Sequence, residues 1–406
     1  MIMTENKTQK HILVISQYFC PEQFRINDIC CEWVKRGYKV TVLTGIPNYP
    51  QGKFYDGYGW NKKRKETWNG IDIIRIPLIP RGHSSIGMVL NYLSFPISGW
   101  FWKIKTKIKP NYIFMFETSP MTQCKIGVWF KKKVHVPLYL YAQDLWPENV
   151  EVITGIHNKL VINPIQRMVD KIYNACDHIF VTSPSFVESV CERGISRDKV
   201  HYWPQYAEEF YVPMDRKQVP EIPDDGRLKI VFTGNIGYAQ GLDILPKAAN
   251  ILKEEGYGNK ICFVIIGDGR YKPQLEQEIE DNRDMFIMIS RQPAERIPEL
   301  LAACDIAFLS FANNDLWKKT IPAKLQSYMA CGMPVIASAD GETGRIIGEA
   351  DCGICSRIGD SEALAKNIER IKTEDIKGMR ERSRIYFEKH FNKKMLMDKM
   401  ELYFYQ

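Results

Sequence analysis

The stretch "LKIVFTGNIGYAQGLD", residues 228–243, combines two patterns that together predict one kind of fold. Its first half is a nearly continuous apolar run, which is typical of a parallel strand buried on both faces. Its second half turns through Gly234, Asn235, Gly237 and Gly241 toward a helix-like segment. Glycines in such a turn let backbone amides approach a phosphate, and the helix dipole favours an anion there. The alternative is a turn that only packs the strand against the helix.

The same strand-like pattern recurs along the whole chain and alternates with helix-like stretches. This alternation predicts parallel sheets that are covered by helices on both faces. The expected strands are 11–19, 39–45, 71–77, 111–118, 138–144 and 178–183 in the first half, and 228–235, 260–267, 286–290, 306–311 and 334–338 in the second. The predicted fold class is α/β, with two doubly wound, Rossmann-like domains that face each other across a cleft.

A Pro-rich stretch of mixed charge separates the two groups of strands. We therefore expect an N-terminal domain over residues 1–205, a linker over 206–226 and a second domain over 227–380. The remaining residues, 381–406, read as an amphipathic helix that packs back on the N-terminal domain. Residues 1–205 carry 27 Lys and Arg against 16 Asp and Glu, whereas the remainder carries 28 against 32. This asymmetry suggests different partners for the two domains.

The composition is that of an ordinary globular protein, with 45% hydrophobic and 25% charged residues in a chain of 406. The start of the chain has no long apolar run, so we expect no secretory signal. The eleven cysteines are interpreted as reduced, mostly buried thiols of a cytosolic protein. The seven histidines have no metal-site spacing, so we expect no metal and no cofactor. Nothing in the sequence indicates nucleic-acid binding.

A second strand-turn-helix segment, "FVIIGDGRYKPQLE" at residues 263–276, repeats the glycine pattern. In an α/β domain this turn lies at the same edge of the sheet as the first turn. Gly267 and Gly269 would allow the backbone to approach a base or ribose closely, and Arg270 could reach a phosphate. The shared edge strengthens two motifs that are weak one by one.

The third segment, "TIPAKLQSYMACGMPV" at residues 320–335, places Lys324 in the first turn of a predicted helix. Pro322 fits the start of that helix and Gly332 its end. A cation is disfavoured at a helix N-terminus. One interpretation is a surface lysine whose stem covers apolar atoms. The other is that Lys324 and the helix N-terminus together hold a diphosphate, which would make the contact favourable.

Three more segments accompany these motifs: "QYFCPEQFRINDICCEWVKRGYKVTVLTGIPNYPQGKFYDGY" (17–58), "YAQDLWPENV" (141–150) and "HIFVTSPSFVE" (178–188). In order and spacing, all six segments resemble the family 4 retaining glycosyltransferases of GT-B fold. The resemblance covers nearly the whole chain. It is greatest to enzymes that build bacterial O-antigen and capsule repeats, including those that transfer N-acetylfucosamine-type sugars.

The resemblance implies a hexosyltransferase-type reaction without a metal. A sugar, of the N-acetylamino type, would move from a nucleotide-diphosphate donor, with UDP as the preferred nucleotide, to a glycan linked to polyprenyl diphosphate. Lys324 would neutralise the leaving phosphate, where charge develops in the transition state. The donor would be bound mainly by the second domain and the acceptor mainly by the first.

The resemblance also assigns positions. The donor-side residues would be Gly234, Asn235, Ile236, Gly237, Gln240, Gly267, Gly269, Arg270 and Ser327. Glu22, Asn48 and Tyr49 would face the acceptor, and Asp144 would lie near the reacting centre as a catalytic residue. Asp144 is either a general base or a structural aspartate beside Trp146.

The sequence departs from the family pattern at several of these positions. Many family 4 enzymes carry a Glu-x7-Glu pair, and its two positions are Lys319 and Ser327 here. Gln240 stands where relatives often have a second phosphate-binding lysine, and Gln143 where they often have a histidine. The donor ribose must therefore be held in some other way.

An apolar and aromatic run, residues 86–102, leads into "KIKTKIKP" at residues 103–110. The run contains Asn91 and Pro96 and is shorter than the ~20 residues of a spanning helix. Aromatic residues beside clustered lysines suit the surface of an anionic membrane. We therefore expect peripheral attachment through residues 86–109 to the inner face of the cytoplasmic membrane. The alternative is a buried helix with a solvated basic end.

The sequence leaves two alternative functions open and disfavours a third. A sugar-nucleotide epimerase is possible because some isomerases share the GT-B architecture. A non-catalytic protein that binds a nucleotide sugar stays an alternative because the carboxylate pair is missing. A dinucleotide-dependent oxidoreductase is disfavoured, because "GNIGYAQG" lacks the G-x-G-x-x-G pattern and "SQYFCPEQ" (16–23), after the first strand of the chain, has no glycine.

Overall fold

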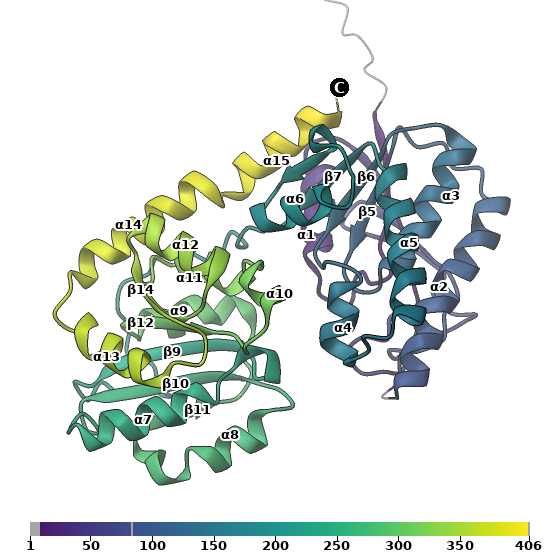
Figure 1. The fold of residues 1–406 in the computed structure, drawn as a ribbon. Helices are drawn as coiled ribbons and strands as arrows, with labels where there is room; N and C mark the ends of the chain where they lie inside the picture. Colours follow the sequence, from purple (N-terminus) through teal and green to yellow (C-terminus); the bar gives the residue numbers. More distant parts are fainter. Residues whose placement is uncertain (1–8, 83, 405–406) are drawn as a thin grey trace, which may run out of the picture. The chain divides into compact units, whose positions relative to one another are not determined.

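The computed structural model describes residues 9–82 and 84–404. Within these residues the chain forms two compact units, and in each of them helices pack against a sheet (Figure 1). The first unit takes up the described residues through Val181 together with Val187–Tyr202. The second takes up Thr182–Phe186 and the described residues from Trp203 onward.

The first unit is built on an eight-stranded sheet of the order β3-β4-β2-β1-β5-β6-β7-β8. All neighbours pair in parallel except β3 and β4, which are antiparallel. The strands are β1 (His11–Ile15), β2 (Lys39–Thr44), β3 (Lys65–Trp68), β4 (Ile71–Arg75), β5 (Tyr112–Glu117), β6 (Leu138–Ala142), β7 (His178–Val181) and β8 (Val200–Tyr202). The helices are α1 (Arg25–Lys35), α2 (Ser85–Lys105), α3 (Lys125–Val134), α4 (Glu148–Thr154) and α5 (Lys159–Ala175). Helix α6 (Pro184–Cys191) is divided between the units, since only its residues from Val187 onward belong to the first.

The second unit has a six-stranded, fully parallel sheet of the order β11-β10-β9-β12-β13-β14. The strands are β9 (Leu228–Asn235), β10 (Ile261–Asp268), β11 (Phe286–Ile289), β12 (Ile306–Ser310), β13 (Val335–Ser338) and β14 (Gly353–Ser356). The helices are α7 (Ile244–Glu254), α8 (Lys272–Glu278), α9 (Ile297–Ala302), α10 (Asp315–Lys318), α11 (Ala323–Ala330), α12 (Gly341–Ala350), α13 (Ser361–Ile371), α14 (Ile376–His390) and α15 (Lys393–Glu401).

Each sheet has one point where the strand order reverses, and ligands of such sheets bind at the carboxyl ends of the strands there. In the first unit the reversal lies between β1 and β5, and in the second between β9 and β12. Buried apolar side chains of strands and helices form the core beneath these edges, for example Phe232, Leu245 and Leu364 in the second unit. Both reversal points therefore lie on a packed apolar base.

The predicted fold class is confirmed, and all eleven expected strands are present with ends shifted by a few residues. The apolar pattern does not predict β3, β8 and β14, which are short and lie at or next to sheet edges. Their residues are only partly buried, for example Gly353–Cys355 and most of Lys65–Trp68. Such strands carry a weak apolar signal because only one side of the ladder is covered.

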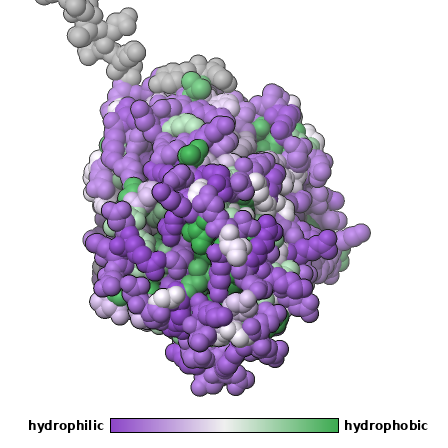
Figure 2. Space-filling view, turned by 90° about the vertical axis from the view of Figure 1, so that its left-hand side faces the viewer, coloured by the Kyte–Doolittle hydropathy of each residue, from purple (hydrophilic) through white to green (hydrophobic). Residues whose placement is uncertain are grey.

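Helix α2 presents an apolar face to solvent. Its exposed residues recur at helical spacing, and each has 43–74% of its surface accessible to solvent. They are Ile86, Val89, Leu90, Leu93, Ile97, Trp100, Phe101 and Ile104. We call these eight residues the α2 stripe. The face of the molecule in Figure 2, by comparison, is mostly hydrophilic with small apolar areas. The helix is continuous through Asn91 and Pro96, both of which are buried on its other face.

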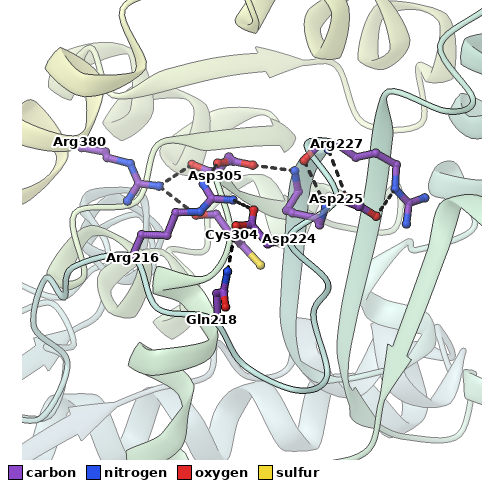
Figure 3. Close-up of polar contacts among 9 residues, drawn as sticks. Arg216, Gln218, Asp224, Asp225, Arg227, Cys304, Asp305 and Arg380 are labelled. Atoms are coloured by element: carbon purple, nitrogen blue, oxygen red, sulfur yellow. Dashed lines mark hydrogen bonds and ion pairs between the residues drawn. The ribbon is translucent and has the colours of Figure 1, made fainter.

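The predicted linker, 206–226, carries one isolated bridge, Val219 to Ile222, and no helix or strand along its described length. Polar contacts hold its second half against the amino ends of β9 and β12 (Figure 3). Arg216 Nη1 lies 2.6 Å from Asp305 Oδ1, and the backbone amide of Lys229 donates to Asp305 Oδ2 at 2.8 Å. Arg380 of α14 donates to the carbonyl of Cys304 at 2.9 Å. The segment is thus fixed to the second sheet.

The C-terminal segment is helical as predicted, in two pieces that meet at Phe391 and Asn392. Asn392 caps α15 because its side chain accepts a hydrogen bond from the amide of Met395. Within the second unit the indole of Trp203 donates to the carbonyl of Leu396 at 2.7 Å, and both residues are buried. The packing of this segment on the first unit stays a prediction.

Candidate functional site

The two glycine turns of the second unit lie side by side at the carboxyl edge of its sheet. Strands β9 and β10 pair along their whole length, so Gly234 is opposite Gly267. A Cβ atom on Gly267 would lie 1.9 Å from the carbonyl oxygen of Gly234, and one on Gly269 would lie 2.2 Å from that of Ile236. Only glycine fits such close backbone contacts. The expected shared edge is therefore confirmed.

Strands β9 and β12 separate at this edge. They pair only at two positions near their amino ends, Ile230 with Ile306 and Val231 with Ala307. Farther along, the hydroxyl of Tyr328 on α11 accepts a hydrogen bond from the amide of Thr233 at 2.9 Å. Helix α11 thus fills the opening between the strands, which brings its first turn to the glycine loop.

Lys324 lies in that first turn and reaches the glycine loop. Its ammonium stands 4.2 Å above the centre of the Phe232 ring and donates to the side-chain oxygen of Gln240. A Cβ on Gly234 would lie 3.0 Å from Lys324 Cε, so a larger residue there would displace the lysine. The ring contact favours the charged form. Burial nevertheless lowers the pKa of Lys324 to about 7, because removal from water disfavours the charged form.

The ends of α11 lie close to the positions predicted from the sequence. Pro322, which the sequence predicts as the first helical residue, stands instead at the N-cap position, one residue before the observed first helical residue, Ala323. Gly332 follows the helix with φ of +63°, and its amide donates to the carbonyl of Met329 at 3.0 Å. The amide of Met333 donates to the carbonyl of Tyr328 at 2.9 Å, which completes a Schellman motif.

The other predicted donor-side residues differ in how they could serve. Asn235 and Arg270 are exposed at the edge, and Arg270 pairs with no carboxylate within the described residues. The side chain of Ile236 is buried in the core, and its amide donates to the carbonyl of Asp268 at 2.8 Å. The hydroxyl of Ser327 lies 3.2 Å from the carbonyl of Ala323 in its own helix. Their contacts with a donor stay predictions.

In the first unit, the three predicted acceptor-side residues lie together. The carboxylate of Glu22 accepts hydrogen bonds from the amides of Asn48 at 2.8 Å and Tyr49 at 2.6 Å. Burial raises the pKa of Glu22 to about 7, although these bonds oppose the shift. The ring of Tyr49 is partly exposed beside Tyr18 and Phe24. Glu22 therefore shapes the loop, whereas Tyr49 is free to face a ligand.

A buried amide network, not predicted from the sequence, supports that loop. Asn91 of α2 donates to the carbonyl of Ile79 at 2.6 Å and accepts from the side-chain nitrogen of Gln17 at 2.7 Å. The backbone amide of Gln17 donates to the side chain of Gln123 at 2.7 Å. These side chains and that of Asn48 are fully buried. A polar residue inside the apolar run of α2 was the one signal that the sequence offered.

Asp144 follows β6 at the same edge. Both the amide and the hydroxyl of Ser119 donate to its Oδ2 at 2.8 Å. Its Oδ1 receives no hydrogen bond from the part of the chain that the structure describes. Beside it lies Glu117, the last residue of β5, which is fully buried and whose Oε1 has no partner there either. Burial raises the pKa of both carboxyl groups, and the charge of Asp144 raises that of Glu117 further.

Tyr92 joins the loop to Asp144. Its ring lies 6.5 Å from that of Trp146 and 5.9 Å from the guanidinium carbon of Arg81. The charges of Asp144 and Arg81 both act on its phenol, and burial raises its pKa. The structure therefore brings Tyr49, Arg81, Tyr92 and Asp144 together, and the sequence singled out only the first and last.

Residues 9–82 and 84–404 contain no group of three or more His, Cys, Asp and Glu side chains that could hold a metal ion. The chain does contain one Cys-x-x-Cys spacing, at Cys352 and Cys355 on or beside β14. Both are free thiols, and burial raises the pKa of each to about 12. They are inert, packed thiols.

Two family models match the chain in succession. "Glycosyltransferase Family 4" matches residues 24–205, and "Glycosyl transferases group 1" matches residues 214–390. A protein of Escherichia coli K12 named as the colanic acid biosynthesis glycosyl transferase WcaI is 25% identical over 356 residues, 82% of this chain and 84% of the relative.

Solved glycosyltransferase structures share the fold. Sucrose-phosphate synthase from Thermosynechococcus elongatus matches with a TM-score of 0.74 at 16% identity, over 97% of this chain and 98% of that one. HepE from Anabaena, in complex with UDP, matches with a TM-score of 0.67 at 14% identity over the same shares of the two chains.

Proposed function

We propose a specific reaction for this chain, which is a glycosyltransferase of GT-B fold with a family 4 domain followed by a group 1 domain. It transfers a sugar of the N-acetylamino type from a nucleoside diphosphate, UDP, to a glycan linked to a lipid diphosphate in the synthesis of a bacterial surface polysaccharide. The role in surface polysaccharide synthesis is supported by the colanic acid relative. UDP is supported by the complex of HepE.

The placement of Lys324 carries the proposal. Its ammonium stands at the reversal point of the second sheet, between the glycine loop and the first turn of α11. Within the described residues it forms no ion pair with a carboxylate, and burial lowers its pKa, so a diphosphate there would favour its charged form. A fixed cation at the leaving group stabilises the charge that develops as the glycosidic bond breaks.

The step that we propose retains the sugar's configuration. The acceptor hydroxyl oxygen forms a bond to the anomeric carbon on the face from which the phosphate departs, and the bond between that carbon and the phosphate oxygen breaks. The hydroxyl proton passes to the departing phosphate, so the products are the glycoside and the nucleoside diphosphate. Lys324 offsets the leaving charge, and no metal is required in this proposal.

Asp144 has the geometry to orient the acceptor hydroxyl. Ser119 holds one carboxylate oxygen with two hydrogen bonds, which fixes the orientation of the other. A carboxylate with one pinned oxygen can accept a hydrogen bond from a sugar hydroxyl through the second. We propose this positioning role rather than that of a general base, since the departing phosphate already receives the proton.

The transfer proposal is tested with purified protein, a panel of UDP-sugars and a short-chain lipid-diphosphate-linked sugar. We expect release of UDP together with a glycosylated lipid product. Conversion of one UDP-sugar into another without acceptor would identify an epimerase instead, and binding of UDP-sugars without any turnover would identify a binding protein.

We also propose that the α2 stripe attaches the protein to the cytoplasmic face of the membrane. Its eight exposed apolar residues form one face of the helix, which the alternative of a buried helix does not explain. Lys103 and Lys125 lie over the rings of Trp100 and Trp129, at the basic end of this face. Apolar area flanked by lysines matches an anionic lipid surface. No helix among the described residues has the length and apolar character to cross a membrane.

Flotation with vesicles that contain about one-third anionic lipid tests this attachment. We expect wild-type protein to float, and changing Lys103, Lys105, Lys107 and Lys109 to Glu to reduce the floating fraction severalfold. Changing Trp100 and Phe101 to Ser should reduce it as well. Unchanged flotation of both variants would remove α2 from the membrane contact.

A further inference from the structure

The guanidinium of Arg81 is a positive charge that the proposed reaction does not use. Its central carbon lies 5.5 Å from the centre of the Tyr49 ring and 5.9 Å from that of Tyr92. Its one side-chain hydrogen bond within the described residues runs from Nη2 to Met88 Sδ at 3.5 Å. No described carboxylate lies within ion-pair distance of it. Two aromatic faces therefore hold a cation whose N–H groups stay available to a ligand.

The backbone around Arg81 is fixed on both sides. Its amide donates to the buried side-chain oxygen of Asn48 at 3.0 Å, and the amide of Gly82 donates to the carbonyl of Gly52 at 2.9 Å. The first turn of α2 packs against it closely, because a Cβ on Gly87 would lie 2.8 Å from the carbonyl oxygen of Arg81. The position of the guanidinium thus follows from the buried network beneath it.

Arg81 stands between a polar and an apolar surface of the first unit. On one side lies the ring of Tyr92, which is 6.5 Å from the ring of Trp146, two residues after Asp144, where we place the acceptor hydroxyl. On the other side, the α2 stripe begins at Ile86, five residues farther along the chain. A lipid-diphosphate-linked sugar has the same order of parts: a polar sugar, an anionic diphosphate and an apolar chain.

We propose that Arg81 binds the diphosphate of the lipid-linked acceptor. The guanidinium lies over the rings of Tyr49 and Tyr92, and its N–H groups can form paired hydrogen bonds to phosphate oxygens. The apolar chain then leaves along the α2 stripe. This inference rests on the proposed function and adds the site that recognises the lipid end of the acceptor.

Binding of farnesyl diphosphate, measured by titration calorimetry, tests the site directly. We expect Arg81→Ala to weaken binding at least tenfold and Arg81→Lys to weaken it less, because lysine keeps the charge but not the paired geometry. Lys53→Ala, which removes an exposed cation from the neighbouring loop, should bind as the wild type does. Equal binding by wild type and Arg81→Ala would overturn the proposal.

Two further ligands separate the possible sources of the phosphate. Farnesol should not bind, and inorganic diphosphate should bind at least tenfold more weakly than farnesyl diphosphate. Inorganic diphosphate that binds as tightly, through a site that Arg81→Ala weakens, would overturn the lipid assignment and leave a site for soluble phosphates. Arg81→Ala should still float with anionic vesicles. Loss of flotation would show instead that Arg81 contacts the headgroups of the membrane.

The transfer assay distinguishes failure of this inference from failure of the proposed function. With a lipid-diphosphate acceptor, Arg81→Ala should raise KM for the acceptor at least tenfold and leave KM for the UDP-sugar unchanged. A wild-type protein that binds farnesyl diphosphate through Arg81 but transfers no sugar would refute the transferase reaction alone. If the protein transfers sugar and Arg81→Ala leaves KM for the acceptor unchanged, this inference alone is refuted.

Discussion

The reversal points of the two sheets are built from different parts of the polypeptide. In the second unit, the edge consists of backbone at Gly234, Gly267 and Gly269, with the side chain of Lys324 against Gly234. In the first unit, the edge is a set of buried side chains joined by hydrogen bonds. The edge of the second unit depends on local conformation, whereas the edge of the first unit depends on tertiary packing. We therefore expect substitutions to affect mainly ligand binding in the second unit and mainly stability in the first.

The largest effect should come from Lys324→Ala. Loss of the cation at the leaving group should lower turnover on the order of 100-fold. Stability should hardly change, because the ammonium is held by one amide and one ring. Steady-state release of UDP and thermal unfolding measure the two properties. Lys247→Ala, an exposed lysine of α7, is the control and should keep full activity. A fully active Lys324→Ala would refute the phosphate role.

Asn91→Leu should show the opposite behaviour. The substitution leaves the buried side-chain nitrogen of Gln17 and the carbonyl of Ile79 without their partner. We expect a loss of about 3 kcal/mol in the free energy of unfolding of the first unit. Binding of UDP should not change, since the donor edge belongs to the other unit. Urea unfolding and UDP titration measure these effects, and weakened UDP binding at unchanged stability would contradict the comparison.

Glu22→Gln should reveal the cost of the buried carboxyl group. The raised pKa of Glu22, about 7, means that the folded state prefers the protonated form. Its contribution to stability is therefore present at low pH and falls as the pH rises from about 4.5 through 7. The difference in Tm between Glu22→Gln and wild type should therefore shift by about 5 °C in favour of the variant as the pH rises from about 5.5 to about 8. A difference in Tm that does not vary with pH would show that Glu22 is ionised throughout.

The smallest signal should be a proton taken up by the second unit when UDP binds. The pKa of Lys324 is lowered to about 7, and a bound diphosphate should raise it again. Binding at pH of about 7.5 should then take up between half and one proton, roughly, per UDP. Calorimetry in buffers of different ionisation enthalpy measures this uptake, which Lys324→Met should abolish. UDP affinity should fall as the pH rises above about 7.

The same difference explains how far the sequence predicts each site. The glycine turns and Lys324 lie within short segments whose sequence pattern predicts their conformation. Their position at one edge of the second sheet could therefore be predicted. Gln17, Asn48, Asn91 and Gln123 are far apart in the sequence and meet only through the packing of α2 on the sheet. No local pattern encodes such a network. Arg81 and Tyr92 escaped prediction for the same reason.

The hydrogen bond from Thr233 to Tyr328 makes one backbone amide a reporter for the whole donor edge. Where β9 and β12 diverge, this phenol partners the amide in place of a neighbouring strand. Exchange of the Thr233 amide with deuterated solvent therefore requires α11 to move away, together with Lys324 one turn earlier on the same helix. Slower exchange at this single position in the presence of UDP would measure how firmly the nucleotide fastens that helix to the sheet.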